Sequence, residues 1–225
     1  MGIINTKSLA HTLDAIQDLE FQGKKLTGFV RDEAEAWLTE RHWARGAYRG
    51  LYAPTEADFL QPLKLFTGEA VTSNVGIRHI LGEEAARALI MLDPISAKAK
   101  QAVAETTDIL RELAQNEDNP HGVFCCGKCT VSMWRHLLAA KLPNSEAIFN
   151  SGIAHLRSLR DGEGRWHSFT YYYTLYTLLD IDLPAAREEL AYALPAIERA
   201  LTRAARPGIH PTRNREVLVR VVNSL

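Results

Sequence analysis

Apolar residues recur at steps of three and four along almost the whole chain, and this spacing constrains the fold more than any other feature. On an α-helix such a spacing gathers apolar side chains on one face, whereas a half-buried strand needs sustained alternation of apolar and polar residues. No stretch of the sequence alternates in this way over the length of a strand. The sequence therefore predicts an all-α fold.

Start and stop signals divide this pattern into helices. Residues 55–58 are typical of a capping box that opens a helix, Gly82-Glu83-Glu84 places acids at the positive end of a helix dipole, and Asp93-Pro94 is typical of an N-cap followed by proline. Residues 216–222 are rich in valine and would suit a strand, but a single strand has no partner. The expected helices carry Leu9, Leu13, Ile16 and Leu19; Val30, Ala34, Trp37 and Leu38; an apolar face of Ile95, Ala99, Ala102, Thr106, Ile109 and Leu113; and residues 82–92, 128–140, 145–160, 169–179 and 184–205.

Length and charge narrow the class of protein. A chain of 225 residues buries roughly 70% of its unfolded surface, so we expect a single all-α domain over residues 1–225. The 26 basic and 27 acidic side chains nearly cancel, which argues against a nucleic-acid binder, and the Arg-rich stretch 199–220 is interpreted as a solvated face. The apolar runs are too short to span a membrane. With no secretion signal at its start, the chain is expected in the cytoplasm.

Internal repetition is the most informative feature of the sequence. Residues 109–143 and 155–184 align as helix, polar loop, glycine followed two residues later by an aromatic side chain, second helix and proline-terminated turn; residues 34–53 form a fainter copy. In the alignment Gly122 pairs with Gly164. Because one helical hairpin cannot bury its own apolar face, such units are expected to stack.

This pattern resembles the α/α-toroid repeat of the protein prenyltransferase and terpenoid cyclase (squalene cyclase-like) superfamily. The resemblance rests on Gly122-Val123-Phe124 followed by residues 129–134, Cys-Thr-Val-Ser-Met-Trp, and on residues 172–176, Tyr-Tyr-Thr-Leu-Tyr. It implies inner and outer helices around an apolar cavity, here as a partial or small toroid because the chain is short, and an isoprenoid-like ligand. Another helical-repeat superhelix remains the alternative fold.

The same resemblance implies zinc. Of the three positions at which the prenyltransferases bind the metal, Cys129 is retained, whereas Gly127 stands where the family has aspartate and Tyr173 where it has histidine. The acidic motifs of the cyclases are absent, and Asp180-Ile181-Asp182 is a partial echo of one of them.

Three cysteines within five residues are the strongest chemical signal in the chain. They are too close in sequence to join distant segments by disulfides, which favours a reducing compartment. Cys126-x-x-Cys129 is half of a metal site, and His121 is the candidate third ligand, for zinc. The repeat alignment places His167 at the position of Cys125, so Cys125 or Cys129 with His167 is the candidate catalytic pair. Small buried cysteines packed between helices are the structural alternative.

Two groups of residues are candidates for ligand binding. The aromatic side chains around the second repeat predict either core packing or the wall of a pocket. The stretch 66–79 lacks helical periodicity and is expected to be a long loop whose Asn74, Arg78 and His79 suit an anion, unless it is a solvated connector. The aromatic candidates are Trp134, Trp166, Tyr172, Tyr173 and Tyr176.

These observations favour a protein that binds or transforms a hydrophobic, isoprenoid-like small molecule in an aromatic-lined cavity with the cysteine cluster at its rim. A transferase or lyase and a binding protein both fit this description, and a homodimer would help to complete a short ring. A non-catalytic helical-repeat module that binds a protein partner and a zinc-stabilised structural domain are the alternatives.

Overall fold

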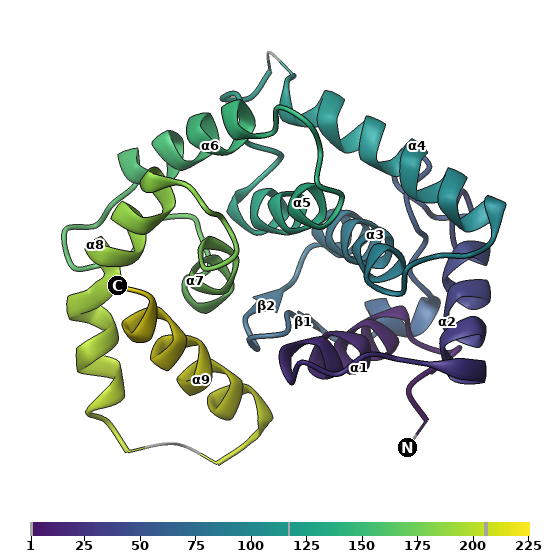
Figure 1. Ribbon diagram of the computed structural model, residues 1–225, viewed down its shortest axis with the longest axis horizontal. Coiled ribbons are helices and arrows are strands. Elements are labelled where there is room, and N and C mark those ends of the chain that lie inside the picture. The colour runs from purple at the N-terminus through teal and green to yellow at the C-terminus, as the bar shows by residue number, and fades with distance from the viewer. Residues whose placement is uncertain (1, 117, 205–206) are drawn as a thin grey trace. The chain divides into compact units, whose positions relative to one another are not determined.

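A computed structural model describes residues 2–116, 118–204 and 207–225, and over these residues the fold is all-α, as predicted (Figure 1). Besides its α-helices, the described part of the chain contains the 3₁₀ turn η1 (Glu56–Phe59) and an antiparallel pair of short strands, β1 (Leu63–Lys64) and β2 (Ala70–Val71). None of the described helices has the length and apolar character that crossing a membrane requires. The helices are α1 (Leu9–Phe21), α2 (Gly28–Glu40), α3 (Asn74–Met91), α4 (Ala97–Ala114), α5 (Gly127–Ala139), α6 (Glu146–Ser158), α7 (Tyr171–Leu178), α8 (Pro184–Leu201) and α9 (Ile209–Ser224).

The chain divides into two compact units. The first comprises Met1–Phe66, Ala70–Glu112 and Arg135–Lys141, and the second comprises Thr67–Glu69, Leu113–Trp134 and Leu142–Leu225. The first unit therefore holds α1 to α3, most of α4 and the end of α5. The second holds the start of α5 and all of α6 to α9.

In the first unit, α3 packs against α1 and α2 and is buried along most of its length. The buried carboxylate of Glu84 organises the polar contacts of this helix. It accepts hydrogen bonds from Gln17 Nε2 at 2.6 Å and Arg135 Nε at 3.1 Å, and Arg87 Nη1 lies 3.3 Å from it. A buried charge is stable only where such partners surround it, so Glu84 fixes α1 and the end of α5 against α3.

The start of α3 differs from the prediction. The helix begins at Asn74, eight residues before the predicted start at Gly82, and the Oγ atom of Ser73 accepts a hydrogen bond from Gly76 N at 3.1 Å as its N-cap. The expected long loop 66–79 is therefore wrong over residues 74–79, which are helical. Asn74 and Val75 are exposed and Arg78 is half-buried, whereas residues 79–89 are all buried. The apolar residues of α3 therefore form no single stripe that would reveal where the helix starts.

Two other boundaries also differ from the prediction, and the valine-rich tail, which the sequence left ambiguous, has a defined structure. The capping box at Thr55 is present but opens only the short turn η1. Asp93 has a left-handed φ of 53°, and α4 begins later, where Ser96 Oγ accepts a hydrogen bond from Ala99 N at 3.2 Å. The valine-rich tail is helical, as part of α9.

The predicted end of α8 at Ala205 lies outside the described residues. Ala99, Ala102, Thr106 and Leu113 form the buried face of α4, whereas Ile95 is exposed.

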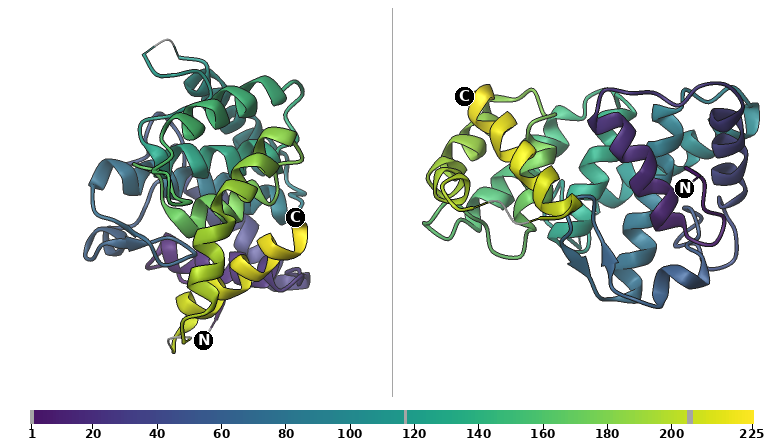
Figure 2. Two further views of the ribbon diagram at one scale, coloured as in Figure 1. Left: turned by 90° about the vertical axis from the view of Figure 1, so that its left-hand side faces the viewer. Right: turned by 90° about the horizontal axis from the view of Figure 1, so that it is seen from below.

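In the second unit, α8 packs against α6, α7 and α9, and α7 packs against α9 (Figures 1 and 2). The fully buried carboxylate of Glu189 on α8 holds this arrangement together. It accepts hydrogen bonds at 2.9 Å from Arg157 Nε, from Arg160 Nη2 and from the indole Nε1 of Trp166. One carboxylate therefore joins the end of α6 and the following loop to α8.

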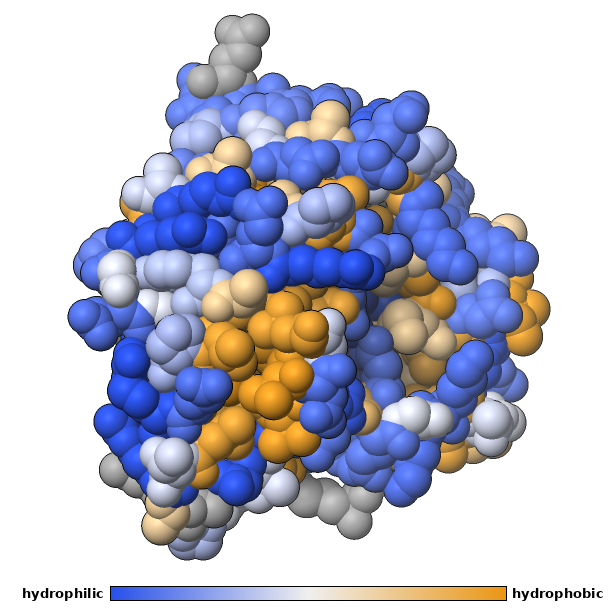
Figure 3. All heavy atoms as spheres, turned by 60° about the vertical axis from the view of Figure 1, so that its left-hand side comes forward, coloured by the Kyte–Doolittle hydropathy of each residue, from blue (hydrophilic) through white to orange (hydrophobic). Residues whose placement is uncertain are grey.

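Apolar side chains also reach the surface. Figure 3 shows a patch of them, bordered by polar side chains, on the side of the molecule that carries α8 and α9 in Figure 1. On α9 itself Ile209, Val219 and Val222 are exposed.

The two glycines that define the repeat have the left-handed backbone expected of them. The φ angle is 79° at Gly122 and 87° at Gly164. Gly122 N donates a 2.7 Å hydrogen bond to the carbonyl of Ala114, the last residue of α4. A Cβ at Gly122 would lie 2.1 Å from the carbonyl oxygen of Ile148 and 2.7 Å from the nitrogen of Gly152, so two backbone segments meet there without room for a side chain.

Candidate functional site

The cysteine cluster lies in the second unit, where a tight turn leads into α5. Cys125 has a left-handed φ of 55°, and Cys126 N donates a 2.6 Å hydrogen bond to the carbonyl of Phe124. Thr130 Oγ1 accepts a hydrogen bond from Phe124 N and donates one to Phe124 O, both at 3.0 Å, which locks the turn onto the helix. A residue other than glycine in this backbone region is strained, and such strain is concentrated at functional sites.

Cys126 is the N-cap residue of α5. Its carbonyl accepts the first bond of the helix, from Thr130 N at 2.8 Å, and its sulfur accepts hydrogen bonds from the backbone N–H groups of Lys128 and Cys129. These two donors would otherwise be unsatisfied at a helix start. The helix therefore binds the sulfur of Cys126 as it would bind a carboxylate or hydroxyl cap.

The sulfurs of Cys125 and Cys126 each lie near that of Cys129. The Sγ atoms of Cys126 and Cys129 are 3.6 Å apart, and the Sγ atom of Cys125 lies within 4.8 Å of that of Cys129. Cys129 is fully buried on α5, whereas Cys125 and Cys126 are exposed. The buried Cys129 thus anchors the cluster in the protein, and the two exposed cysteines can be reached from solvent.

The surroundings favour the ionised form of the exposed thiols. A hydrogen bond with Cys129, opposed in part by burial and supported by the two backbone N–H groups, lowers the pKa of Cys126 to about 5. A hydrogen bond with Cys129 also lowers the pKa of Cys125. The lowered pKa of a thiol at a helix N-terminus is a general effect of the oriented amide groups.

The donor set fits a soft metal ion. Zinc in a tetrahedral site lies at about 2.3 Å from each thiolate, which separates two bound sulfurs by about 3.8 Å. The distance of 3.6 Å between Cys126 and Cys129 is close to this value. Cys125, Cys126 and Cys129 are therefore the residues of this unit that could hold such an ion, and three thiolates leave one position of the tetrahedron for another ligand.

The two histidines predicted beside the cysteines lie in exposed positions. Among the described residues, the side chain of His121 makes no hydrogen bond or ion pair. His167 is exposed and interacts electrostatically with Asp161. The described residues give no contact between His167 and a cysteine, so the catalytic pair predicted from the repeat alignment gains no support and remains a prediction.

The predicted aromatic wall is mostly core. Trp134 and Trp166 are buried, and their indole Nε1 atoms donate to Gly122 O at 2.8 Å and to Glu189 Oε2 at 2.9 Å. Tyr173 and Tyr176 are also buried. Tyr172 alone among the five predicted side chains is half-buried, and it lines a pocket between helices of the second unit.

Arg78 and His79 belong to the first unit and lie on α3 instead of a loop. Arg78 Nη1 donates to the carbonyl of Gly46 at 3.1 Å, and its guanidinium lies 5.0 Å from the centre of the Phe59 ring. The ring of His79 is buried and its centre lies 4.1 Å from that of Tyr48. Burial, with a smaller effect from a nearby arginine, lowers its pKa to about 4.

The sequence patterns did not predict a role for the carboxyl group of Glu69. Glu69 of the second unit accepts a 2.8 Å hydrogen bond from Tyr172 N at the start of α7, and burial raises the pKa of its carboxyl group. Its hydroxyl partner is Thr67. A pairing of residues about a hundred positions apart leaves no local pattern by which it could have been found.

Compared with known protein families, curated proteins and solved structures, the chain has no match.

Proposed function

We propose that the protein binds a soft metal ion, with zinc the expected one, through the thiolates of Cys125, Cys126 and Cys129. The single observation that carries this proposal is the 3.6 Å separation of the sulfurs of Cys126 and Cys129 at a helix start whose amides hold one of them. Thiolate ligands select zinc and other soft ions over hard ions such as magnesium. The metal role of Cys129 also agrees with the resemblance to the zinc-dependent prenyltransferases.

Each cysteine has a distinct part in this proposal. The sulfur of Cys129 is buried on α5, and backbone N–H groups bind the sulfur of Cys126. The left-handed backbone of Cys125 sets the direction of its side chain. Bound zinc would keep a thiol nucleophile deprotonated or polarise a ligand at the remaining position. The turn and the helix start therefore supply a preorganised, partly exposed ligand set.

The ligand class that we propose is a hydrophobic small molecule of isoprenoid type, and the activity that of a transferase or lyase or of a binding protein. The support is the resemblance of the two repeats to the α/α toroid. We further propose a reducing compartment such as the cytoplasm, because the cluster needs free thiols.

Cobalt substitution tests the metal site. Metal-free protein reconstituted with Co²⁺ is expected to show thiolate-to-cobalt charge-transfer absorption, weaker in Cys125→Ser and Cys126→Ser in proportion to the thiolates removed. Lys128→Gln, which changes a neighbouring residue but no sulfur, serves as the matched control and should retain the spectrum. Absorption without a thiolate band, or a band that survives the loss of both cysteines, would overturn the proposal.

The remaining ligand can be found in the same assay. His79, His121 and His167 are the histidines that the sequence brought forward, and each is replaced by alanine in turn. Loss of the tetrahedral cobalt spectrum in one variant identifies a histidine ligand. An unchanged spectrum in all three indicates water or a substrate group at that position.

A dithiol redox centre is the second candidate function. It is favoured by one specific observation, an exposed Cys126 of low pKa beside a buried Cys129, which is the arrangement of attacking and resolving thiols. Oxidation by an external disulfide would join these sulfurs and release two electrons and two protons to that oxidant. Metal-free protein that equilibrates with a glutathione buffer through a single disulfide, and that binds no cobalt, would favour this function over the metal site.

A further inference from the structure

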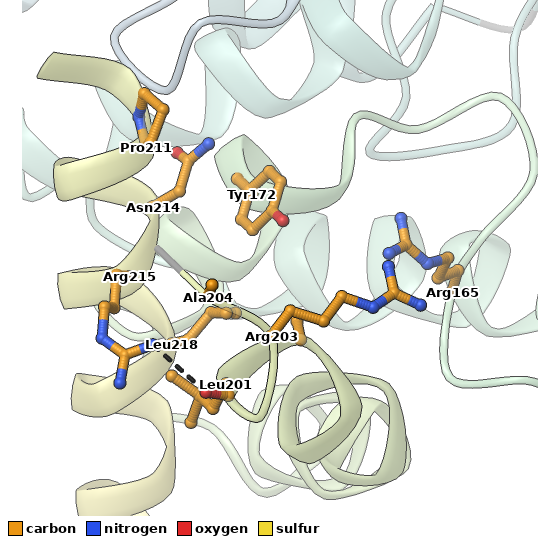
Figure 4. Close-up of a pocket in the computed structure, with 10 residues that line it drawn as sticks. Arg165, Tyr172, Leu201, Arg203, Ala204, Pro211, Asn214, Arg215 and Leu218 are labelled. Atoms are coloured by element: carbon orange, nitrogen blue, oxygen red, sulfur yellow. Dashed lines mark hydrogen bonds between the residues drawn. The ribbon is translucent and has the colours of Figure 1, made fainter. Parts of the chain in front are cut away.

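A second site lies away from the cysteines, within the second unit. A pocket of about 320 Å³ opens where the end of α8, the first turns of α9 and Tyr172 of α7 meet (Figure 4). The chain segment before α7 contributes Arg165, the segment just after α8 contributes Arg203, and α9 contributes Asn214 and Arg215. A volume of this size accommodates a small molecule.

The charged side chains that line this pocket are all positive. Among the residues that the structure describes, three arginines line it and no aspartate or glutamate does. The guanidinium group of Arg165 lies 4.1 Å from the centre of the Tyr171 ring, and Arg215 Nη1 donates to the carbonyl of Leu201 at 3.2 Å. Figure 4 shows the side chains of Arg165 and Arg203 extending toward one another. Among the described residues, Arg203 has no carboxylate partner.

In the part of the chain that the structure describes, other arginines of the same unit, unlike those of the pocket, are paired with carboxylates. Arg157 and Arg160 are paired with Glu189, and Arg199 lies 3.6 Å from a carboxylate oxygen of Glu163. These three arginines thus have carboxylate partners, whereas Arg165 contacts an aromatic ring and Arg215 donates to a carbonyl. The sequence interpretation of residues 199–220 as a solvated face did not anticipate this, because Arg165 comes from another part of the chain.

Polar groups in the pocket also lack partners. The Oδ1 atom of Asn214 is buried and, within the described part of the chain, accepts no hydrogen bond. The hydroxyl group of Tyr172 likewise has no hydrogen bond to a described residue. An asparagine amide can present either its oxygen or its NH₂ group, since the two orientations occupy the same space. Buried polar groups in native proteins are normally satisfied, and a bound ligand is one way to satisfy them.

We infer that this pocket binds a small oxyanion that carries more than one negative charge, of the phosphate or polycarboxylate class. Guanidinium groups bind such oxygens through paired, charge-assisted hydrogen bonds. Arg165 and Arg203 would hold the anion between them, and the amide of Asn214 and the hydroxyl of Tyr172 would complete its contacts. The pocket lies near the N-terminal end of α9, whose dipole favours negative charge.

Calorimetric titration of the whole, metal-free chain with inorganic phosphate and, separately, with citrate tests this inference. Binding of either anion supports it, and the stronger one identifies the class. Arg203→Ala and Arg165→Ala should each weaken binding by about tenfold or more, as expected for a lost charged hydrogen bond. Arg203→Lys, which keeps the charge but not the paired geometry, should weaken it less.

Arg187→Ala is the matched control, because Arg187 lies in the same unit, is exposed, and has the exposed Asp182 as its partner. This variant should bind the anion as the unmodified protein does. Two results would overturn the inference: no binding of phosphate or citrate at moderate salt, or equal loss in Arg187→Ala and Arg203→Ala, which would indicate a general charge effect. Circular dichroism of each variant excludes unfolding as the cause of a loss.

Discussion

The indole Nε1 atom of Trp134 donates a 2.8 Å hydrogen bond to the carbonyl oxygen of Gly122. This bond connects the middle of α5 to the loop that precedes the cysteine cluster, and it passes beside Gly152 of α6, where a Cβ would lie 2.6 Å from the Trp134 ring. The glycine and the tryptophan that mark the repeat in the sequence are therefore in direct contact. Their contact positions the turn from which Cys125 and Cys126 project.

Gly122→Ala should destabilise the second unit severely. The new methyl group would lie 2.1 Å from the carbonyl oxygen of Ile148, and both segments are backbone, so neither can move aside cheaply. We expect a loss of at least about 3 kcal/mol in the free energy of unfolding, measured by urea denaturation. Gly162→Ala is the control, because its φ of 83° is similar but no described residue lies within 4 Å of its Cβ position. It should cost about 1 kcal/mol. Equal losses would show that backbone strain, and not close approach, dominates at Gly122.

Glu189→Gln should be far more harmful than the loss of a surface ion pair. Glu189 is fully buried and accepts hydrogen bonds from two arginines and Trp166, so the change removes the charge of an acceptor that three donors share. Because both guanidinium groups are partly exposed and Arg157 also pairs with Glu188, we expect a cost of about 1.5–3 kcal/mol. Asp182→Asn, which removes the exposed partner of Arg187, should cost less than about 1 kcal/mol. Thermal unfolding of both variants beside the unmodified chain measures the difference, and a Glu189→Gln variant as stable as Asp182→Asn would contradict the assignment of this carboxylate as the anchor of α8.

The stability of the first unit should fall as the pH drops from 7 to 5, in part through His136. Burial lowers the pKa of this imidazole to about 4, and its Nε2 atom lies 2.9 Å from Thr107 Oγ1. An unfolded histidine has a pKa of about 6.5, so below that pH the unfolded chain binds a proton that the folded chain does not. The folded state therefore loses roughly 2 kcal/mol from this group between pH 7 and pH 5.

His136→Gln tests that assignment, since the glutamine amide can replace Nε2 as the partner of Thr107 but does not titrate. The variant should show a shallower dependence of the unfolding free energy on pH between 7 and 5 than the unmodified chain. An identical dependence would mean that other groups, such as the buried His79, account for the acid sensitivity.

The sequence predicted the helices well where one face meets solvent and poorly where none does. Leu9, Leu13 and Ile16 are buried on α1 as expected, because an exposed opposite face makes the period visible. In α3 the burial of residues 79–89 on every side removed that period, and the partly exposed start at Asn74 was missed. The strain at Cys125 and the buried bond between Glu69 and α7 have no signature in the sequence.

The sequence predicted which residues form the candidate site but not their geometry. Cys126 and Cys129 were identified from their spacing, and a helix start near them was expected. The N-cap role of Cys126 depends on which residue begins α5, a detail that boundaries drawn from sequence do not resolve. The pocket lined by Arg165 and Arg203 depends on contacts between distant segments, which no local pattern encodes.

Metal content tests the central claim most directly. Zinc is counted by mass spectrometry in tag-free protein purified under reducing conditions, in Cys129→Ser, and in Ser132→Ala, a control at another fully buried position of α5. The account predicts about one zinc per chain in the unmodified protein and in Ser132→Ala, and none in Cys129→Ser. Unmodified protein without zinc that also takes up none when the ion is supplied, or a Cys129→Ser variant that keeps its zinc, would contradict the assignment of the three cysteines as a metal site.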